Sequence, residues 1–172
     1  ALLLKPKLII ADEPVSMVDA SLRATILASL HKLFIDFGIS FIYITHDLTT
    51  AYQVSEKVVV LYHGTVAEAG DVEQVIKDPK HPYTRELIHS IPVPDPGNSW
   101  IEEAVEEKDV EVPDTTTGGC RYTPRCAHAT DRCEHMPPLY RLDDGRVASC
   151  VLYDDREPLD GGDLTSIIGV TP

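Results

Sequence analysis

The chain has 172 residues, enough for one full-sized domain or for one domain and a small appendage. Its 43% hydrophobic and 25% charged residues exclude a wholly disordered or fibrous chain. The 28 acidic residues outnumber the 15 basic ones, and the net charge of −13 would repel a phosphate backbone, so we expect no nucleic-acid partner. No apolar run has the length of a membrane span or of a signal peptide. Because the chain opens without Met inside an apolar pattern, we interpret it as part of a longer protein.

Strand and helix patterns alternate over residues 1–91. Apolar runs predict three strands, at residues 7–12, 40–45 and 57–62. Between the first two, apolar residues recur with helical spacing, and Gly38 can end this helix in a left-handed conformation. Continuous apolar strands joined by a helix favour a parallel α/β sheet covered on both faces. A further short helix is predicted after Asp71, a suitable N-cap, and before Pro79.

The composition changes at residue 92. Three prolines and a glycine within residues 92–97 are typical of a linker, and the acidic stretch at 102–109 is expected to be solvated. All four cysteines follow it. We therefore divide the chain into an α/β part (1–91), a Pro-rich and acidic linker (92–117) and a small, loop-rich, cysteine-containing extension (118–172).

Polar side chains follow the first two predicted strands. Asp12 and Glu13 end the first, and His46 comes at the end of the second. Ligands of open α/β sheets bind beyond the carboxyl ends of the strands, where parallel neighbours would bring these residues together. Adjacent strand residues point in opposite directions, so we expect one carboxylate to hold Mg²⁺ and the other to face a water molecule. The imidazole can donate a hydrogen bond to a γ-phosphate.

Three segments carry a family resemblance. They are Leu8-Ile9-Ile10-Ala11-Asp12-Glu13-Pro14, Ser16-Met17-Val18-Asp19 and Ile42-Tyr43-Ile44-Thr45-His46-Asp47. Together they resemble the second half of the ATPase domain of ABC transporters, a P-loop NTPase sheet with helices. The resemblance implies that Asp12 coordinates Mg²⁺, that Glu13 polarises the attacking water and that His46 is the switch histidine. It also places Ser16 and Asp19 in the D-loop, at the ATP site between two subunits.

The sequence departs from the family pattern in several places. Val15 and Met17 replace a usual Thr and a usual small residue, and neither change affects the metal or the water role. None of the ten glycines is followed by Lys, as a P-loop requires, and the ABC signature is absent. We therefore expect this chain alone to bind ATP poorly and to be inactive, and the longer protein to be the ATPase.

A second motif, His81-Pro82-Tyr83-Thr84, precedes a predicted amphipathic helix, in which Pro82 can occupy the first turn. It resembles the motif of dipeptide and oligopeptide importer ATPases. This implies an ATPase that drives peptide uptake at the cytoplasmic face of a membrane, together with a second ATPase subunit, permease subunits and, indirectly, a substrate-binding protein. Nickel chelates or other small solutes stay open as cargo. The alternatives are a soluble ABC ATPase of repair or translation, and a redox- or iron-sensing module on an ABC scaffold.

The four cysteines have the spacing Cys120-x5-Cys126-x6-Cys133-x16-Cys150. Disulfides suit an oxidising compartment, zinc usually takes closer cysteine pairs, and four widely spaced thiolates suit an iron–sulfur cluster. Free thiols are a further possibility. The segment resembles the cluster-binding extension of peptide-importer ATPases, which favours a [4Fe–4S] cluster with zinc as the alternative. Three interleaved arginines could offset the negative charge of such a cluster: Arg121, Arg125 and Arg132.

Overall fold

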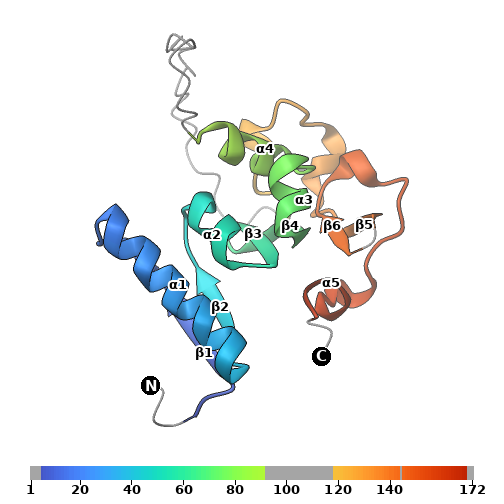
Figure 1. Cartoon of the computed structure of the whole chain (residues 1–172). Helices are drawn as coiled ribbons and strands as arrows, with labels where there is room; N and C mark the ends of the chain where they lie inside the picture. Colours follow the sequence, from blue (N-terminus) through green and yellow to red (C-terminus); the bar gives the residue numbers. More distant parts are fainter. Residues whose placement is uncertain (1–4, 92–117, 144, 170–172) are drawn as a thin grey trace. The chain divides into compact units, whose positions relative to one another are not determined.

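The computed structural model describes residues 5–91, 118–143 and 145–169 (Figure 1). The chain divides into two compact units, Ala1–Glu56 and Lys57–Pro172. Both contain helices and strands, so the predicted mixed α/β class is confirmed. The predicted linker and its acidic stretch lie outside the described residues.

The first unit contains β1 (Leu8–Asp12), α1 (Ala20–Phe37), β2 (Ser40–Ile44) and α2 (Leu48–Val54). The two strands pair in parallel, with Asp12 opposite Ile44. Helix α1 begins after Asp19, whose carboxylate accepts hydrogen bonds from the first backbone amides of the helix. It ends at Gly38, whose φ of 62° is the left-handed conformation expected there. The helix therefore joins the carboxyl end of one strand to the amino end of its parallel neighbour.

Strands β1 and β2 are not covered on both faces by the described residues of the first unit. Alternate side chains are exposed: Leu8 (48%), Ile10 (64%), Ile42 (48%) and Ile44 (48%). The opposite side chains are partly buried, and α1 runs beside the strands in Figure 1. The prediction of two covered faces is therefore wrong for residues 5–56. A run of apolar residues indicates which side chains need cover, and it does not identify the segment that supplies it.

The second unit is built on an antiparallel sheet with the strand order β3-β4-β6-β5. Its elements are β3 (Lys57–Tyr62), β4 (Thr65–Asp71), α3 (Val72–Lys77), α4 (Pro82–His89), β5 (Tyr140–Asp143), β6 (Arg146–Ala148) and α5 (Thr165–Ile168). As predicted, Asp71 caps α3 and Pro82 lies in the first turn of α4. Strand β6 pairs with β4, so the cysteine-containing segment completes the same sheet.

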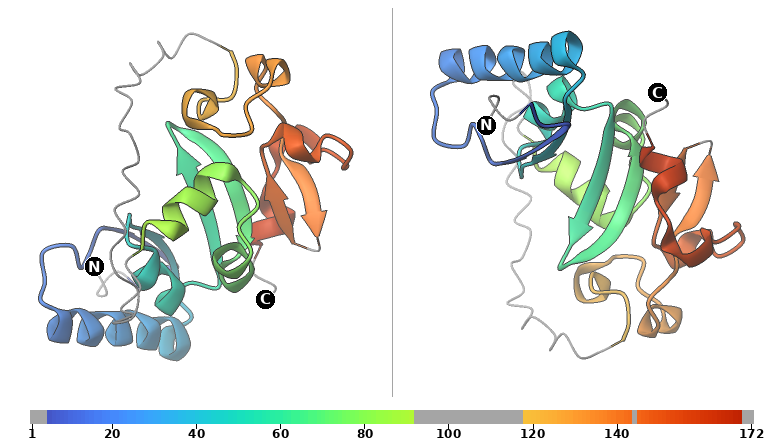
Figure 2. Two further views of the ribbon diagram at one scale, coloured as in Figure 1. Left: turned by 90° about the horizontal axis from the view of Figure 1, so that it is seen from above. Right: turned by 90° about the horizontal axis from the view of Figure 1, so that it is seen from below.

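The two faces of this sheet carry separate apolar cores. On one face Val60 and Ala67 pack with Val75 of α3 and with partly buried side chains of α4. Figure 2 shows α4 lying against the strands of this sheet. On the other face Ala69 packs with Val147 of β6 and with Leu159 and Ile167. The third apolar run thus packs against a core on each face, although Leu61 stays 58% exposed and the strand pairs antiparallel and not parallel. Continuous apolar character therefore does not predict strand direction.

Gly70→Ala is expected to weaken the pairing of β4 with β6. A Cβ on Gly70 would lie 2.9 Å from Cγ, 3.1 Å from Cβ and 3.3 Å from Cα of Arg146, so backbone as well as side chain would have to move. We expect the free energy of unfolding to fall by about 1–3 kcal/mol, the usual effect of overpacking, in urea titrations followed by circular dichroism.

Gly118→Ala provides the matched control. No atom lies within 4 Å of the Cβ that this substitution would add. The free energy of unfolding of this variant should therefore stay within about 0.5 kcal/mol of that of the parent protein. Equal losses in the two variants would contradict the steric explanation.

Candidate functional site

Glu13 and His46 meet at the carboxyl ends of β1 and β2. The His46 Nδ1 atom lies 2.8 Å from the Glu13 Oε1 atom. The parallel register brings the residues after Asp12 and Ile44 to one edge, and the Glu13 amide donates to the Ile44 carbonyl at 2.9 Å. The structure thus brings together the two residues for which the sequence predicts catalytic roles.

A tight turn after β1 sets the direction of the Glu13 side chain. Glu13 has a φ of 42°, a left-handed conformation that non-glycine residues seldom adopt. Ser16 closes the turn, since its amide and its hydroxyl both donate to the Glu13 carbonyl, at 3.2 and 3.0 Å. The side chains of Glu13 and His46 remain 45% and 78% exposed. The carboxylate is therefore held by His46 and is still accessible to a water molecule.

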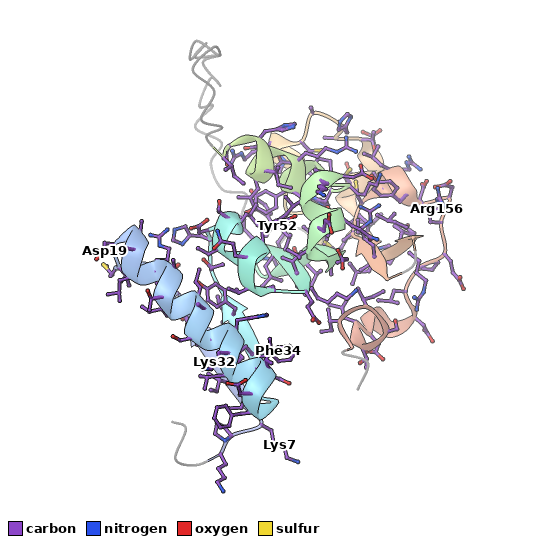
Figure 3. The ribbon with its side chains drawn as sticks, viewed as in Figure 1. Lys7, Asp19, Lys32, Phe34, Tyr52 and Arg156 are labelled. Carbon is purple, nitrogen blue, oxygen red and sulfur yellow. The ribbon has the colours of Figure 1, made fainter. Side chains whose placement is uncertain are left out.

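The other predicted residues of this site lie at the end of β1 and in the turn that leads to α1. Asp12 is exposed at the last position of β1. Asp19 lies at the start of α1 (Figure 3), where hydrogen bonds from the Leu22 amide and the Ser21 hydroxyl lower the pKa of its carboxyl. Met17, two residues before Asp19, is 99% exposed. Within this chain Ser16 and Asp19 thus have visible structural roles, and their nucleotide-binding roles stay predictions.

Asp47 is a residue of the site that the sequence analysis did not select. Its carboxylate caps α2 by accepting from the Thr49 amide at 2.9 Å, and it pairs with Arg23 of α1 at 3.3 Å. These contacts fix the backbone directly after His46. The signal was present in the sequence, because an aspartate followed by a helical pattern is a typical N-cap.

The four cysteines line one pocket in the second unit, which we call the cysteine site. Cys133 and Cys150 are buried, Cys120 and Cys126 are partly buried, and all four are free thiols. Burial raises the pKa of the Cys126 and Cys150 thiols. The Cys120 amide donates to the Cys133 carbonyl at 2.9 Å, which closes the loop that carries the first three cysteines. The structure therefore brings the predicted cysteines together.

The three arginines of this segment fasten its loops to the rest of the unit. Arg121 donates to the His63 carbonyl at 2.8 Å, Arg125 pairs with Glu86 of α4, and Arg132 pairs with Asp154. Tyr122 also donates to Glu86. These contacts give the arginines a structural role, and the charge-offsetting role suggested by the sequence stays a prediction.

The arrangement of the cysteines bears on the kind of metal site. Within residues 5–91, 118–143 and 145–169, no three or more His, Cys, Asp or Glu side chains form a group that could hold a metal ion. The four thiols line a common pocket without forming such a group, and this finding applies to a zinc ion and to an iron–sulfur cluster alike.

Comparisons with known proteins find similarity to the same class of protein that the sequence motifs resemble. Residues 67–133 match the family described as "Oligopeptide/dipeptide transporter, C-terminal region". The chain is 42% identical over 151 residues to a probable peptide ABC transporter ATP-binding protein of Sinorhizobium fredii, covering 87% of this chain and 42% of that protein. It is 36% identical over 154 residues to a dipeptide transport ATP-binding protein of Haemophilus influenzae (89% and 47% covered). An oligopeptide transport ATP-binding protein of Bacillus subtilis is 38% identical over 156 residues (90% and 47%).

The chain is thus similar to the ATP-binding proteins of ABC transporters, and its residues 67–133 match the C-terminal region of the oligopeptide/dipeptide transporters among them. The resemblance stated from the motifs is confirmed. The chain spans about half the length of the curated relatives it matches. Among the helices that the structure describes, none combines the length and the apolar character needed to cross a membrane.

Proposed function

We propose that the chain supplies the Glu13 side of the ATP site in the ATPase subunit of a peptide-type ABC importer, bound at the cytoplasmic face of a membrane. The observation that carries this proposal is the 2.8 Å contact between Glu13 and His46 at the edge where Asp12 ends its strand. The names of the relatives support peptide as the cargo.

Each residue of this edge has a distinct task in hydrolysis. Glu13 accepts a hydrogen bond from the attacking water and takes up its proton as the water attacks the γ-phosphate. His46 holds the carboxylate in place and directs its remaining ring nitrogen to a γ-phosphate oxygen. The exposed Asp12 carboxylate offers the oxygen ligand that Mg²⁺ prefers, and the metal ion would neutralise charge on the phosphates. Ser16 and Asp19 belong to the surface that faces the second ATPase subunit.

Transport assays test this proposal. The full-length subunit, assembled in liposomes with its permease subunits, partner ATPase and substrate-binding protein, should hydrolyse ATP several-fold faster when peptide is added. Stimulation by a nickel chelate and not by peptide would overturn the peptide assignment. Hydrolysis that is unaffected by the membrane subunits would support the soluble ABC ATPase instead.

We further propose that Cys120, Cys126, Cys133 and Cys150 hold a [4Fe–4S] cluster. The proposal is supported by four free thiols that line one pocket and by the wide spacing of these cysteines in the sequence. The His128 amide donates to the Cys126 sulfur at 3.4 Å, a contact that stabilises a thiolate. When bound, the cluster would supply iron–thiolate bonds that cross-link the segment.

A further inference from the structure

Glu86 of α4 holds two residues of the short segment that joins Cys120 to Cys126. The Tyr122 hydroxyl donates a hydrogen bond to the Oε2 atom of Glu86. The Arg125 guanidinium donates to the Oε1 atom and forms an ion pair with the same carboxylate. Both oxygens of one carboxylate are therefore engaged by the same segment of the cysteine site.

The contact through Tyr122 is buried. Tyr122 is 4% exposed, and its ring centroid lies 5.3, 5.6 and 5.9 Å from those of Tyr62, Tyr83 and His81. Burial and the neighbouring Glu86 carboxylate raise the pKa of the Tyr122 hydroxyl. The hydroxyl therefore keeps its proton and can donate it to the carboxylate.

The turn between the two cysteines transmits these contacts to their backbone. The amide and the hydroxyl of Thr123 donate to the Cys120 carbonyl at 3.1 and 2.7 Å. The Cys126 amide donates to the Thr123 carbonyl at 3.2 Å, and the Arg125 amide donates to the Tyr122 carbonyl at 3.0 Å. Because the turn is closed by its own hydrogen bonds, holding its middle residues also holds the cysteines at its two ends.

Helix α4 is a firm support for this carboxylate. The His81 ring caps the helix by accepting a hydrogen bond from the Tyr83 amide at 3.0 Å. Tyr83 and Leu87 pack against the apolar core on one face of the sheet, and Thr84 is fully buried. Glu86 therefore belongs to a helix that is fixed at its start and along its buried side.

We propose that Glu86 is a positioning residue of the cysteine site and that its carboxylate sets the places of Cys120 and Cys126 beside α4. The effect on iron binding rests on the proposed cluster, whereas the placement of the two thiols does not. The His-Pro-Tyr-Thr motif thus starts a helix that also helps to build the cysteine site.

Two substitutions and a control test this role in the full-length protein. Glu86→Ala removes both acceptor oxygens. Tyr122→Phe removes the hydroxyl and keeps the ring among its aromatic neighbours. Glu73→Ala is the matched control, since Glu73 forms an ion pair with Lys77 inside α3, and its side chain is 59% exposed compared with 44% for Glu86.

The first measurement is the loss of iron from anaerobically purified protein in the presence of a chelator. We expect Glu86→Ala to lose iron about 10-fold faster than the parent, as is usual when a group that orients a ligand is removed. Glu73→Ala should lose iron at the parent rate. Because partly exposed ion pairs contribute little to overall stability, both variants should keep the parent's midpoint of unfolding in urea. Loss of iron at the parent rate in Glu86→Ala would overturn the proposal.

The double variant tests whether Tyr122 acts through Glu86. Tyr122→Phe should speed the loss of iron by a smaller factor than Glu86→Ala does. The variant that carries both substitutions should lose iron no faster than Glu86→Ala alone, since the two groups share one interaction. If the two factors multiply in the double variant, the hydroxyl acts independently of the carboxylate and the proposal is overturned.

A further measurement in iron-free protein is independent of the cluster. Alkylation by iodoacetamide, followed by mass spectrometry, should be several-fold faster at Cys120 and Cys126 in Glu86→Ala than in the parent. Labelling of Cys150, which follows β6 in a different segment, should not change. Unchanged labelling at all three positions, or an equal increase at Cys150, would overturn the positioning role. If the parent protein binds no iron while the labelling result holds, the cluster proposal fails and the role of Glu86 stands.

Discussion

Glu13→Gln should lower ATP hydrolysis by the full-length subunit by about 100-fold or more, with ATP binding retained, because the amide cannot take a proton from the attacking water. The substitution preserves the size of a side chain that is 45% exposed and has its neighbour His46 at 2.8 Å. Steady-state phosphate release and equilibrium nucleotide binding are the two measurements. Near-normal hydrolysis would remove Glu13 from the mechanism.

Glu56→Gln is the matched control, since Glu56 is exposed and lies outside the edge formed by β1 and β2. It should leave the rate of ATP hydrolysis unchanged.

His46→Ala should also impair ATP hydrolysis. The variant that carries both Glu13→Gln and His46→Ala should be no slower than Glu13→Gln alone, since the losses of rate are not additive for residues that act as one unit. Additive losses would indicate that His46 acts on the phosphate independently of Glu13.

Elements with strong local signals could be predicted from the sequence. Gly38, Asp71 and Pro82 each occupy the helix terminus that their backbone or hydrogen-bonding chemistry favours. These signals are local because caps and turns involve residues a few positions apart. The end of α1 and the starts of α3 and α4 follow from them.

Strand partners could not be predicted in the same way. The run at β3 is as apolar as those at β1 and β2, yet β3 pairs antiparallel with β4 and carries a core on each face. In β1 and β2 the same composition leaves Ile10 and Ile44 largely exposed within the first unit. Side-chain hydrophobicity specifies the need for burial, whereas the partner depends on contacts distant in sequence.

The distinction between local signals and contacts distant in sequence also applies to the Glu13–His46 edge and to the cysteine site. The meeting of Glu13 and His46 follows from two strand ends and the parallel pairing rule, so the sequence was sufficient. His81 lines the same pocket as the four cysteines, which come from segments far away in the sequence, and no local pattern indicates this arrangement. His81 was accordingly noticed as part of a motif and not as part of the cysteine site.

Full-length protein purified without oxygen should be brown, absorb broadly near ~400 nm and contain about four irons per chain, as expected for a [4Fe–4S] cluster on four thiolates. The physical reason is the convergence of four free thiols on one pocket. Cys126→Ser and Cys150→Ser should each reduce the iron content strongly, since each removes one ligand from a set of four.

His128→Ala is the control for this experiment. His128 lines the same pocket, but its contact with the Cys126 sulfur is made by the backbone amide, which alanine retains. The variant should therefore keep the full iron content and the parent spectrum. Colourless anaerobic protein with one tightly bound zinc ion would refute the cluster and establish a four-cysteine zinc site. Cysteine variants that lose iron while peptide transport is unchanged would show that transport does not need the cluster, as expected for a sensing role.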